Sequence, residues 1–221
     1  MKLTVFGSTG GIGREIVAQA LQAGHEVTAV ARRASAFPAG VRTVVADVTA
    51  PGPGVLESAV RGVDAVLSGL GARTAADLGV AEQGTRAIVR AMAATGVRRI
   101  VVVSAAPIST VASPGRPHPP RHDPGEGFFT RHLVTPLIQR ILRRHYADLA
   151  RMEDVLLQSD VDWTVVRPPR LTNGPPTGTY RTALGRNLPH GITASRADVA
   201  HFMIRALGQP EASRQAVGIA R

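Results

Sequence analysis

The chain opens with a short apolar run that predicts a buried β-strand, followed by a segment with helical spacing. The apolar run covers residues 2–6, and apolar side chains then recur every three or four positions over residues 14–21. Gly24 follows at the position of a helix C-cap, and residues 26–31 form a second strand-like run. Together these segments predict a strand–helix–strand unit.

Strand-like and helix-like patterns keep alternating along the rest of the chain. Further strands are expected at 41–46, 64–69, 98–104, 161–167 and 215–220, and helices near 55–61, 78–95, 136–156 and 194–203. Nearly continuous β-branched runs between amphipathic helices are typical of a parallel sheet that is covered on both faces. The predicted fold class is therefore α/β, a doubly wound parallel sheet (Rossmann fold) within a single domain over residues 1–221.

Three glycines occupy the turn between the first strand and the first helix. Gly7, Gly10 and Gly13 would let the backbone approach a pyrophosphate, whose charge is favoured at the N-terminus of the helix. Glycines at this spacing are weak evidence alone, since a tight turn in an ordinary α/β protein also needs them. Within the strand–helix–strand unit, they predict a nucleotide-binding loop.

Two arginines follow the second strand and bear on the choice of coenzyme. NAD-specific sites carry an acidic residue about 20 positions after the glycines, whereas a 2′-phosphate requires cationic groups there. Arg32 and Arg33 occupy this place, with no carboxylate beside them in the sequence. They predict NADP(H) as the cofactor, the alternative being two solvated surface arginines.

In a doubly wound sheet, ligands bind across the carboxyl ends of the strands. The expected strand ends bring together residues that follow the third, fourth, fifth and sixth strands. These residues are Asp47, Val48, Leu70, Gly71, Ala72, Arg73, Ser104, Ala105, Pro168, Pro169, Arg170 and Leu171.

Composition narrows the possible partners. The net charge is +10, but the arginines are spread along the chain and aromatic residues make up 4%, so no stacking platform for nucleic acid is evident. A basic field that attracts anionic cofactors and substrates accounts for the charge. The chain has no cysteine, no leader-like start and no run of 18 apolar residues. We expect a cytoplasmic protein without a membrane segment, either a monomer or a small homo-oligomer.

A Pro-rich insertion at about 109–128 interrupts the alternating pattern. A long loop beside the crevice is either a lid over the ligand or a surface excursion. Four histidines lie in or near it, but their spacing matches no known ligand pattern, so no metal site is expected. These histidines are His118, His122, His132 and His145.

Several motifs of the chain resemble an atypical, NmrA-like branch of the short-chain dehydrogenase/reductase superfamily. Within it, the sequence is most similar to the biliverdin-IXβ reductase, or NADPH-flavin reductase, family. The resemblance spans nearly the full length. It is carried by Val5–Gly10 with Gly13, Glu26–Thr28 leading to Arg32, Asp47–Val48, Leu70–Arg73, Ser104–Ala105, Arg151–Met152, Pro168–Pro169, Thr177–Tyr180, and Asp198 with His201–Met203.

This resemblance implies a role for each matching segment. Pyrophosphate contacts would come from Ser8, Thr9, Gly10, Gly11 and Ile12, the 2′-phosphate contact from Arg32, and adenine contacts from Asp47 and Val48. Leu70, Gly71 and Arg73 would flank the ribose and nicotinamide, while Ser104 and the Pro168–Pro169 turn would lie close to the reactive ring. The chain departs from that family at Arg170, where a histidine is expected, and in the longer segment 109–145.

The chain lacks the Tyr-Lys pair that most alcohol- and ketone-directed members of the superfamily use for proton transfer. Lys2 is its only lysine, and Ala150 and Leu184 stand four positions after Tyr146 and Tyr180. This favours hydride transfer to a flavin or another conjugated acceptor that needs little help with its proton.

Specific residues are expected to support this reaction. Ser104 would steady the nicotinamide or donate a hydrogen bond to the acceptor, or would simply cap its strand. Arg73 and Arg170 would hold anionic substituents. Two alternatives remain open: an NADP-binding redox sensor without turnover, and a tailoring reductase or isomerase of secondary metabolism.

Overall fold

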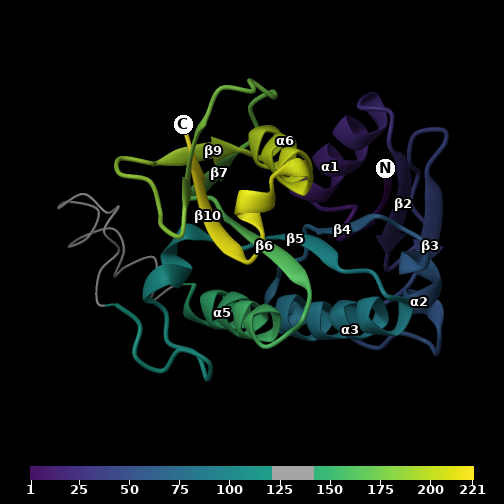
Figure 1. Cartoon of the computed structure of the whole chain (residues 1–221), viewed down its shortest axis with the longest axis horizontal. Helices are drawn as coiled ribbons and strands as arrows, with labels where there is room; N and C mark the ends of the chain where they lie inside the picture. Colours follow the sequence, from purple (N-terminus) through teal and green to yellow (C-terminus); the bar gives the residue numbers. More distant parts are fainter. Residues whose placement is uncertain (121–141) are drawn as a thin grey trace.

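A computed structural model describes residues 1–120 and 142–221 of the chain. Its centre is an eight-stranded sheet in the order β3-β2-β1-β4-β5-β6-β10-β8 (Figure 1). The strands, in that order, are Arg42–Val45, Glu26–Ala31, Lys2–Phe6, Ala65–Ser68, Arg99–Val103, Asp162–Arg167, Gln215–Ala220 and Arg181–Leu184. All run parallel except β8, which is antiparallel to β10. The predicted α/β doubly wound class is confirmed.

Helices cover both faces of the sheet, as Figure 1 shows. α1 (Gly11–Gln22) packs beside α6 (Arg196–Arg205) on one face, and α2 (Val55–Val60), α3 (Val80–Thr95) and α5 (Arg143–Leu157) lie on the other. Short 3-10 helices cover Ala75–Asp77, Ala106–Thr110, Ala206–Gly208 and Pro210–Ala212. The molecule therefore has three layers, with a hydrophobic core on each side of the sheet.

The central strands are apolar along their whole length because each contributes to both cores. In β5, Val101 and Val103 belong to the core under α1 and α6, whereas Ile100 and Val102 belong to the core under α3 and α5. Burying one such side chain contributes about 1.5–3 kcal/mol. Alternate residues of one strand thus pack against the helices on opposite faces of the sheet. This explains why the strands are uninterrupted β-branched runs.

The order of the strands creates a gap between two chain crossovers. From β1 the chain runs outward through β2 and β3, then returns to place β4 on the other side of β1. The connections after β1 and β4 therefore leave the sheet in opposite directions at its carboxyl edge. Such a switch point is where doubly wound sheets bind ligands.

The strands β1, β2 and β10 have the predicted bounds, and the other predicted strands differ by one or two residues at their ends. The last helix begins at Arg196 and not at 194, because Ser195 accepts a hydrogen bond from the backbone N–H of Asp198 and caps the helix. Residues 193–195 instead form β9 (Thr193–Ser195), which pairs with β7 (Arg170–Thr172) in a second, two-stranded sheet.

Three short strands were absent from the sequence prediction. β7, β8 and β9 contain three or four residues each and have no sustained apolar alternation. The expected Pro168–Pro169 turn therefore leads into β7, which contains Arg170 and Leu171. The predicted helix start at Thr135–Pro136 and residues 121–128 of the Pro-rich insertion lie outside the described residues.

A buried carboxylate joins the two helices on the α3 face. Asp148 of α5 accepts hydrogen bonds from the backbone N–H groups of Gly79, Ala81 and Glu82 at 3.1, 3.2 and 3.0 Å. These donors at the start of α3 have no partner within their own helix. Asp148 therefore caps α3 from a neighbouring helix and fixes the connection that follows β4.

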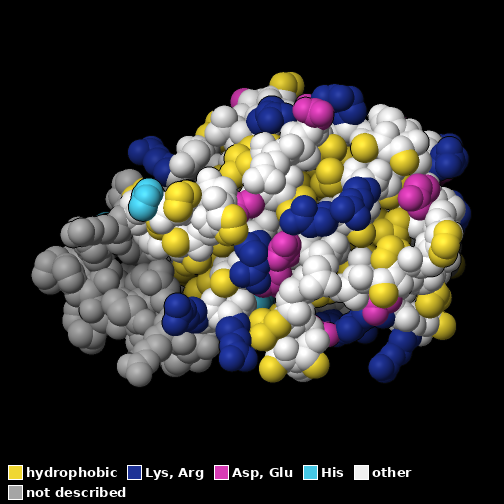
Figure 2. Space-filling view, turned by 90° about the horizontal axis from the view of Figure 1, so that it is seen from below, with side chains coloured by type: hydrophobic (Ala, Val, Ile, Leu, Met, Phe, Trp, Pro, Cys, Tyr) yellow, Lys and Arg dark blue, Asp and Glu magenta, His cyan; other side chains and the backbone are white. Residues whose placement is uncertain are grey.

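Charged and hydrophobic side chains are mixed on one face of the described part of the molecule. On the face seen in Figure 2, Lys and Arg side chains are interspersed with acidic and hydrophobic ones. In the described part of the chain, no helix combines the length and hydrophobicity needed to cross a membrane.

Candidate coenzyme site

The loop between β1 and α1 requires glycine at two positions for different reasons. Gly7 has a φ of +65°, and a Cβ there would lie 2.8 Å from the carbonyl of Gly69. A Cβ on Gly13 would overlap the carbonyl oxygen of Gly7. α1 thus begins directly against the turn, so its free N–H groups face the space above the sheet.

Ser8 has a structural role within this loop. Its side chain is fully buried, and its hydroxyl donates a 2.8 Å hydrogen bond to the carbonyl oxygen of Val30 at the end of β2. The hydroxyl is therefore committed to holding the loop against β2.

A cavity that is open to solvent, with a volume of about 70 Å³, lies above the glycine loop. It is bordered by the carboxyl ends of β1, β2, β3 and β4 and by the start of α3. Its lining residues are Gly7, Thr9, Gly10, Val30, Ala31, Arg32, Ala46, Val48, Gly69, Leu70, Gly71, Arg73, Asp77 and Val80. This set brings together predicted residues from four separate segments of the chain.

Three arginine side chains lie around the glycine loop and make its rim positive. Arg73 donates to the carbonyl oxygen of Thr9 at 2.6 Å, and Arg14 donates to the same oxygen at 3.1 Å. The side chain of Arg196 lies over Gly11, where a Cβ would be 2.6 Å from its Cδ. α1 has no acidic residue in its first turn, so these cations and the helix dipole all favour an anion here.

Arg32 follows β2, the strand that pairs with β1, and lines the same cavity as the glycine loop. Its Nη1 forms an ion pair with Oδ1 of Asp77 at 2.9 Å. The sequence places no carboxylate beside Arg32, but the expectation that none lies near it is wrong, because the fold brings Asp77 against it. Asp77 is 45 positions away in the sequence, in the 3-10 helix Ala75–Asp77, which is why local spacing could not reveal it. Arg33 does not belong to the cavity lining.

Asp47 and Val48 differ in what they present to the cavity. Val48 and its neighbour Ala46 form an apolar part of the lining. The Asp47 carboxylate instead accepts hydrogen bonds from the hydroxyl and the N–H of Thr49 at 2.7 and 2.9 Å, which hold its pKa below the usual range. Its side chain organises the turn, while Ala46 and Val48 form a surface suited to an adenine face.

Ser104 directly follows β5 and takes part in a buried polar chain. Its backbone N–H donates to the carbonyl oxygen of Val166 at 2.8 Å, and its hydroxyl donates to Oε1 of Glu153 at 2.7 Å. Arg167 at the end of β6 binds both carboxylate oxygens of Glu153. All three residues are buried. Because the Ser104 proton is directed to Glu153, its oxygen lone pairs remain to accept a hydrogen bond.

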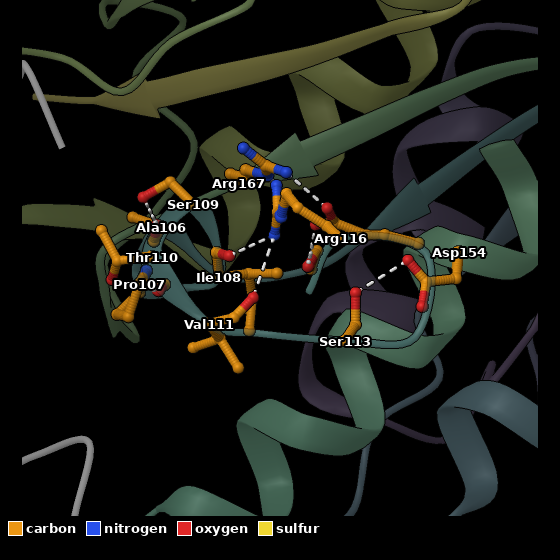
Figure 3. Close-up of polar contacts among 12 residues, drawn as sticks. Ala106, Pro107, Ile108, Ser109, Thr110, Val111, Ser113, Arg116, Asp154 and Arg167 are labelled. Atoms are coloured by element: carbon orange, nitrogen blue, oxygen red, sulfur yellow. Dashed lines mark hydrogen bonds and ion pairs between the residues drawn. The ribbon is translucent and has the colours of Figure 1, made fainter. Parts of the chain in front are cut away.

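The same helix also holds the segment that follows β5. Asp154 of α5 accepts from the hydroxyl of Ser113 at 2.8 Å and from the N–H of Gly115 at 2.9 Å. Arg116 donates to the carbonyl oxygen of Ile108 at 2.5 Å (Figure 3). The start of the Pro-rich insertion is thus fastened to α5 beside Ser104 and Arg167.

The predicted substrate residues lie beyond the cavity described above. Pro168 is placed beside the β5 end, since its carbonyl oxygen accepts from the N–H of Ala106 at 2.9 Å. Arg170 and Leu171 belong to β7, and neither they nor Ser104, Ala105, Pro168 and Pro169 line this cavity. Ala72, Gly11, Ile12 and Gly13 adjoin lining residues without forming part of the lining.

One further side chain near Leu70–Arg73 was not recognised as a site residue from the sequence. A Cβ on Gly71 would lie 4.0 Å from Cε1 of His145. Burial lowers the pKa of His145, and Asp148 opposes this effect only partly, so the imidazole is neutral at pH 7. Within the described residues, no group of three or more His, Asp or Glu side chains is arranged to hold a metal ion; His122 and His132 are not among them.

The tyrosines and the lysine are far from one another. Lys2 starts β1 at the edge of the sheet opposite the glycine loop and lies 3.9 Å from Glu26. Tyr146 is buried in the core under α5, and the Tyr180 hydroxyl lies 2.7 Å from Nδ1 of His201. The fold therefore does not create a Tyr-Lys pair from distant segments.

Comparisons with known proteins agree with this geometry. A sequence profile described as NAD(P)H-binding matches residues 7–210. An uncharacterized sugar epimerase of Bacillus subtilis is 28% identical over 225 residues, covering 98% of this chain and 92% of that protein.

Solved structures with the same fold align over this whole chain, as two examples show. A candidate NADH-flavin reductase from Streptococcus pneumoniae has a TM-score of 0.76 at 23% identity, with 99% of that chain covered. A short-chain dehydrogenase/reductase from Veillonella parvula, solved in complex with NADP, has a TM-score of 0.77 at 18% identity, with 94% of that chain covered. The fold resemblance inferred from the sequence is confirmed.

Glu153 and Arg167 allow a direct test of the buried polar chain. Replacing Arg167 by Met should lower the free energy of unfolding by about 3–5 kcal/mol, because it leaves the Glu153 carboxylate buried without its counter-charge. The double variant Glu153→Gln with Arg167→Met should recover much of this loss. Urea unfolding measures both. As a control, Arg98→Ala breaks an exposed pair with Asp162 and should change stability by less than about 1 kcal/mol. Equal losses in the single and double variants would contradict this account.

Proposed function

The chain belongs to the NAD(P)H-binding family, and from its site we propose that it is an NADPH-dependent reductase that transfers hydride to a flavin or another conjugated, anionic acceptor. The observation that carries the proposal is the cavity that joins the glycine loop to Arg32. It connects amides suited to a pyrophosphate with a guanidinium suited to a 2′-phosphate. The domain is proposed to be a single unit over residues 1–221.

The residues present fit a dinucleotide along this cavity. A side chain at Gly7 or Gly13 would collide with neighbouring backbone, so these positions are built for close packing. The first N–H groups of α1 have no acceptor within their own helix and would be available to a ligand. We assign the pyrophosphate to the amides of residues 8, 9 and 11–13, together with the positive rim formed by Arg14, Arg73 and Arg196. The Gly10 N–H instead donates to the carbonyl oxygen of Gly7 at 2.8 Å, so Gly10 would contribute close approach of the backbone. Ala46 and Val48 would contact the adenine. Arg32 would face the 2′-phosphate, whereas Arg33, which does not line the cavity, would add only to the positive charge around it.

The nicotinamide end is assigned to the carboxyl ends of β4, β5 and β6. Leu70, Gly71 and Ala72 would border the ribose, and Ser104, Ala105, Pro168 and Pro169 would lie near the ring. Glu153 fixes the Ser104 hydroxyl, so its oxygen would accept a hydrogen bond from the carboxamide of the nicotinamide or from an N–H of the acceptor. This refines the sequence-based expectation that Ser104 donates a hydrogen bond.

The bound coenzyme would supply a hydride that, with one proton from water, reduces the acceptor by two electrons and leaves the oxidised coenzyme. The protein contributes orientation: it holds donor and acceptor in van der Waals contact, which accounts for a large part of such rate enhancements. Arg170 and Leu171 on β7, with Arg73 on the other side, are proposed to contact the acceptor. A conjugated acceptor spreads the incoming charge and does not need the missing Tyr-Lys pair.

A redox sensor that binds NADP(H) without turnover is the second candidate. The separation of Lys2 from both tyrosines favours it as well, because a sensor needs no proton donor. The same separation argues against the epimerase activity named for the Bacillus subtilis relative, if that chemistry uses the Tyr-Lys pair of the superfamily. Turnover distinguishes the two candidates.

We expect the purified protein to oxidise NADPH steadily when FMN, riboflavin or biliverdin is present. Loss of absorbance at 340 nm measures the reaction, with protein omitted as the control. Tight binding of NADPH in calorimetry without any oxidation would favour the sensor. Absence of binding by either pyridine coenzyme would overturn the proposed function altogether.

Arg32→Ala should raise the dissociation constant for NADPH about 10- to 100-fold, since hydrogen bonds to charged groups contribute about 1.5–3 kcal/mol each. Arg33→Ala is the control: it removes the same charge from the next residue, which lies outside the cavity lining. It should change the dissociation constant for NADPH less than about threefold. Isothermal titration calorimetry measures both variants. Equal effects of the two substitutions would show that NADPH affinity depends only on the overall positive charge and not on a contact with Arg32.

Ser104→Ala should lower kcat about tenfold, the effect of losing one orienting hydrogen bond, while NADPH affinity changes less than about threefold. Single-turnover kinetics with FMN separate the hydride step from binding. Ser58→Ala, on the exposed surface of α2, is the control and should leave both constants unchanged. An unchanged hydride-transfer rate in the Ser104 variant would show that this serine only stabilises the local structure at the end of β5.

A further inference from the structure

The coenzyme cavity carries opposite charges at the place where doubly wound folds distinguish the two pyridine coenzymes. Arg32 reaches this place from β2, and Asp77 reaches it from the connection between β4 and α3. Of the described residues that line the cavity, Asp77 is the one with an acidic side chain. Its Oδ1 lies 2.9 Å from Nη1 of Arg32.

The Asp77 carboxylate is fixed independently of Arg32. Its second oxygen, Oδ2, accepts from the N–H and the hydroxyl of Thr74 at 3.2 and 3.0 Å, which form a capping box at the start of the 3-10 helix. The Asp77 side chain is 12% exposed, whereas that of Arg32 is 54% exposed. The acid is therefore the anchored member of the pair, and the arginine is the member free to turn toward a ligand.

Asp77 is charged at neutral pH. The hydrogen bonds from Thr74 lower its pKa, burial opposes them, and Arg32 lowers the pKa further. Any ligand group that binds Arg32 from the cavity therefore meets a carboxylate within a few ångström.

The two coenzymes respond differently to this carboxylate. A 2′-phosphate carries a charge of about −1.5 to −2 and must share Arg32 with Asp77 against like-charge repulsion. A free 2′-hydroxyl is neutral and can donate a hydrogen bond to an acidic side chain, which is how NAD-specific sites hold the ribose. The same carboxylate thus opposes one coenzyme and favours the other.

We propose that Asp77 is a specificity-determining residue that counteracts Arg32, so that this site accepts NADH as well as NADPH. The inference rests on the proposed function, because it concerns the same cavity. In this arrangement the acid that NAD-specific proteins place at the end of the second strand is supplied by a different segment, and the arginine typical of NADP-specific proteins is retained beside it.

Replacing Asp77 by Asn tests the proposal. The amide oxygen still accepts from Thr74, but the negative charge is lost. We expect the dissociation constant for NADP⁺ to fall about tenfold or more and that for NAD⁺ to stay equal or rise up to about threefold, as removal of one close like charge predicts. Isothermal titration calorimetry with each oxidised coenzyme gives both constants without relying on catalysis.

Asp160→Asn is the matched control because it removes the same charge from an exposed turn between α5 and β6. It should leave both constants within about twofold, since exposed charges beyond a Debye length are screened. Thermal unfolding of each variant checks that the 3-10 helix survives. If Asp77→Asn is unfolded, Asp77→Ser, which keeps a hydroxyl acceptor, takes its place in the comparison.

The outcomes separate this inference from the proposed function. A shift in the NADP⁺ to NAD⁺ preference in the Asp77 variant, absent in the Asp160 variant, supports the role of Asp77. If both coenzymes bind the unaltered protein but the preference does not move, Asp77 has no part in selection while the proposed function stands. If the unaltered protein binds neither coenzyme, the proposed function itself fails.

Discussion

The contact between the start of α1 and the turn after β1 is the constraint on which the site depends. Gly13 lies against the carbonyl of Gly7, and Gly7 in turn lies against the backbone at Gly69. This packing brings the β1 and β4 connections together at the switch point of the sheet and directs the N-terminus of α1 across it. The cavity follows from backbone packing, and the arginines around it add charge to a geometry that already suits a phosphate.

Buried carboxylates on the C-terminal helices position the loops that surround this contact. Asp148 caps α3, Glu153 and Asp154 fix the end of β5 and the segment after it, and Asp198 of α6 accepts from the backbone of Thr177 and Gly178. Burial alone would raise the pKa of Asp198, but hydrogen bonds from Thr177, Ser195 and Gly178 outweigh it and lower the pKa. The second half of the chain thus organises loops from both halves through anions that accept several hydrogen bonds each.

The sequence predicted those parts of the molecule that local periodicity and local spacing encode. The strands of the parallel sheet and the glycine loop depend on neighbouring residues, so their bounds were close to the observed ones. Partners distant in sequence were beyond this reasoning: Asp77 meets Arg32 across 45 positions, and Glu153 meets Ser104 across 49. The short strands β7, β8 and β9 were also missed, because three or four residues carry too little alternation to stand out from a loop.

The position of Lys2 has a practical consequence for handling the protein. As the single lysine in the sequence, it places the one side-chain amine at the edge of the sheet opposite the glycine loop. Chemistry directed at the lysine side chain therefore attaches a dye, a biotin or a solid support at this one edge of the molecule. Immobilised in this way, every copy presents its cavity outward, so a sensor surface made from this protein is uniformly oriented without any engineered tag.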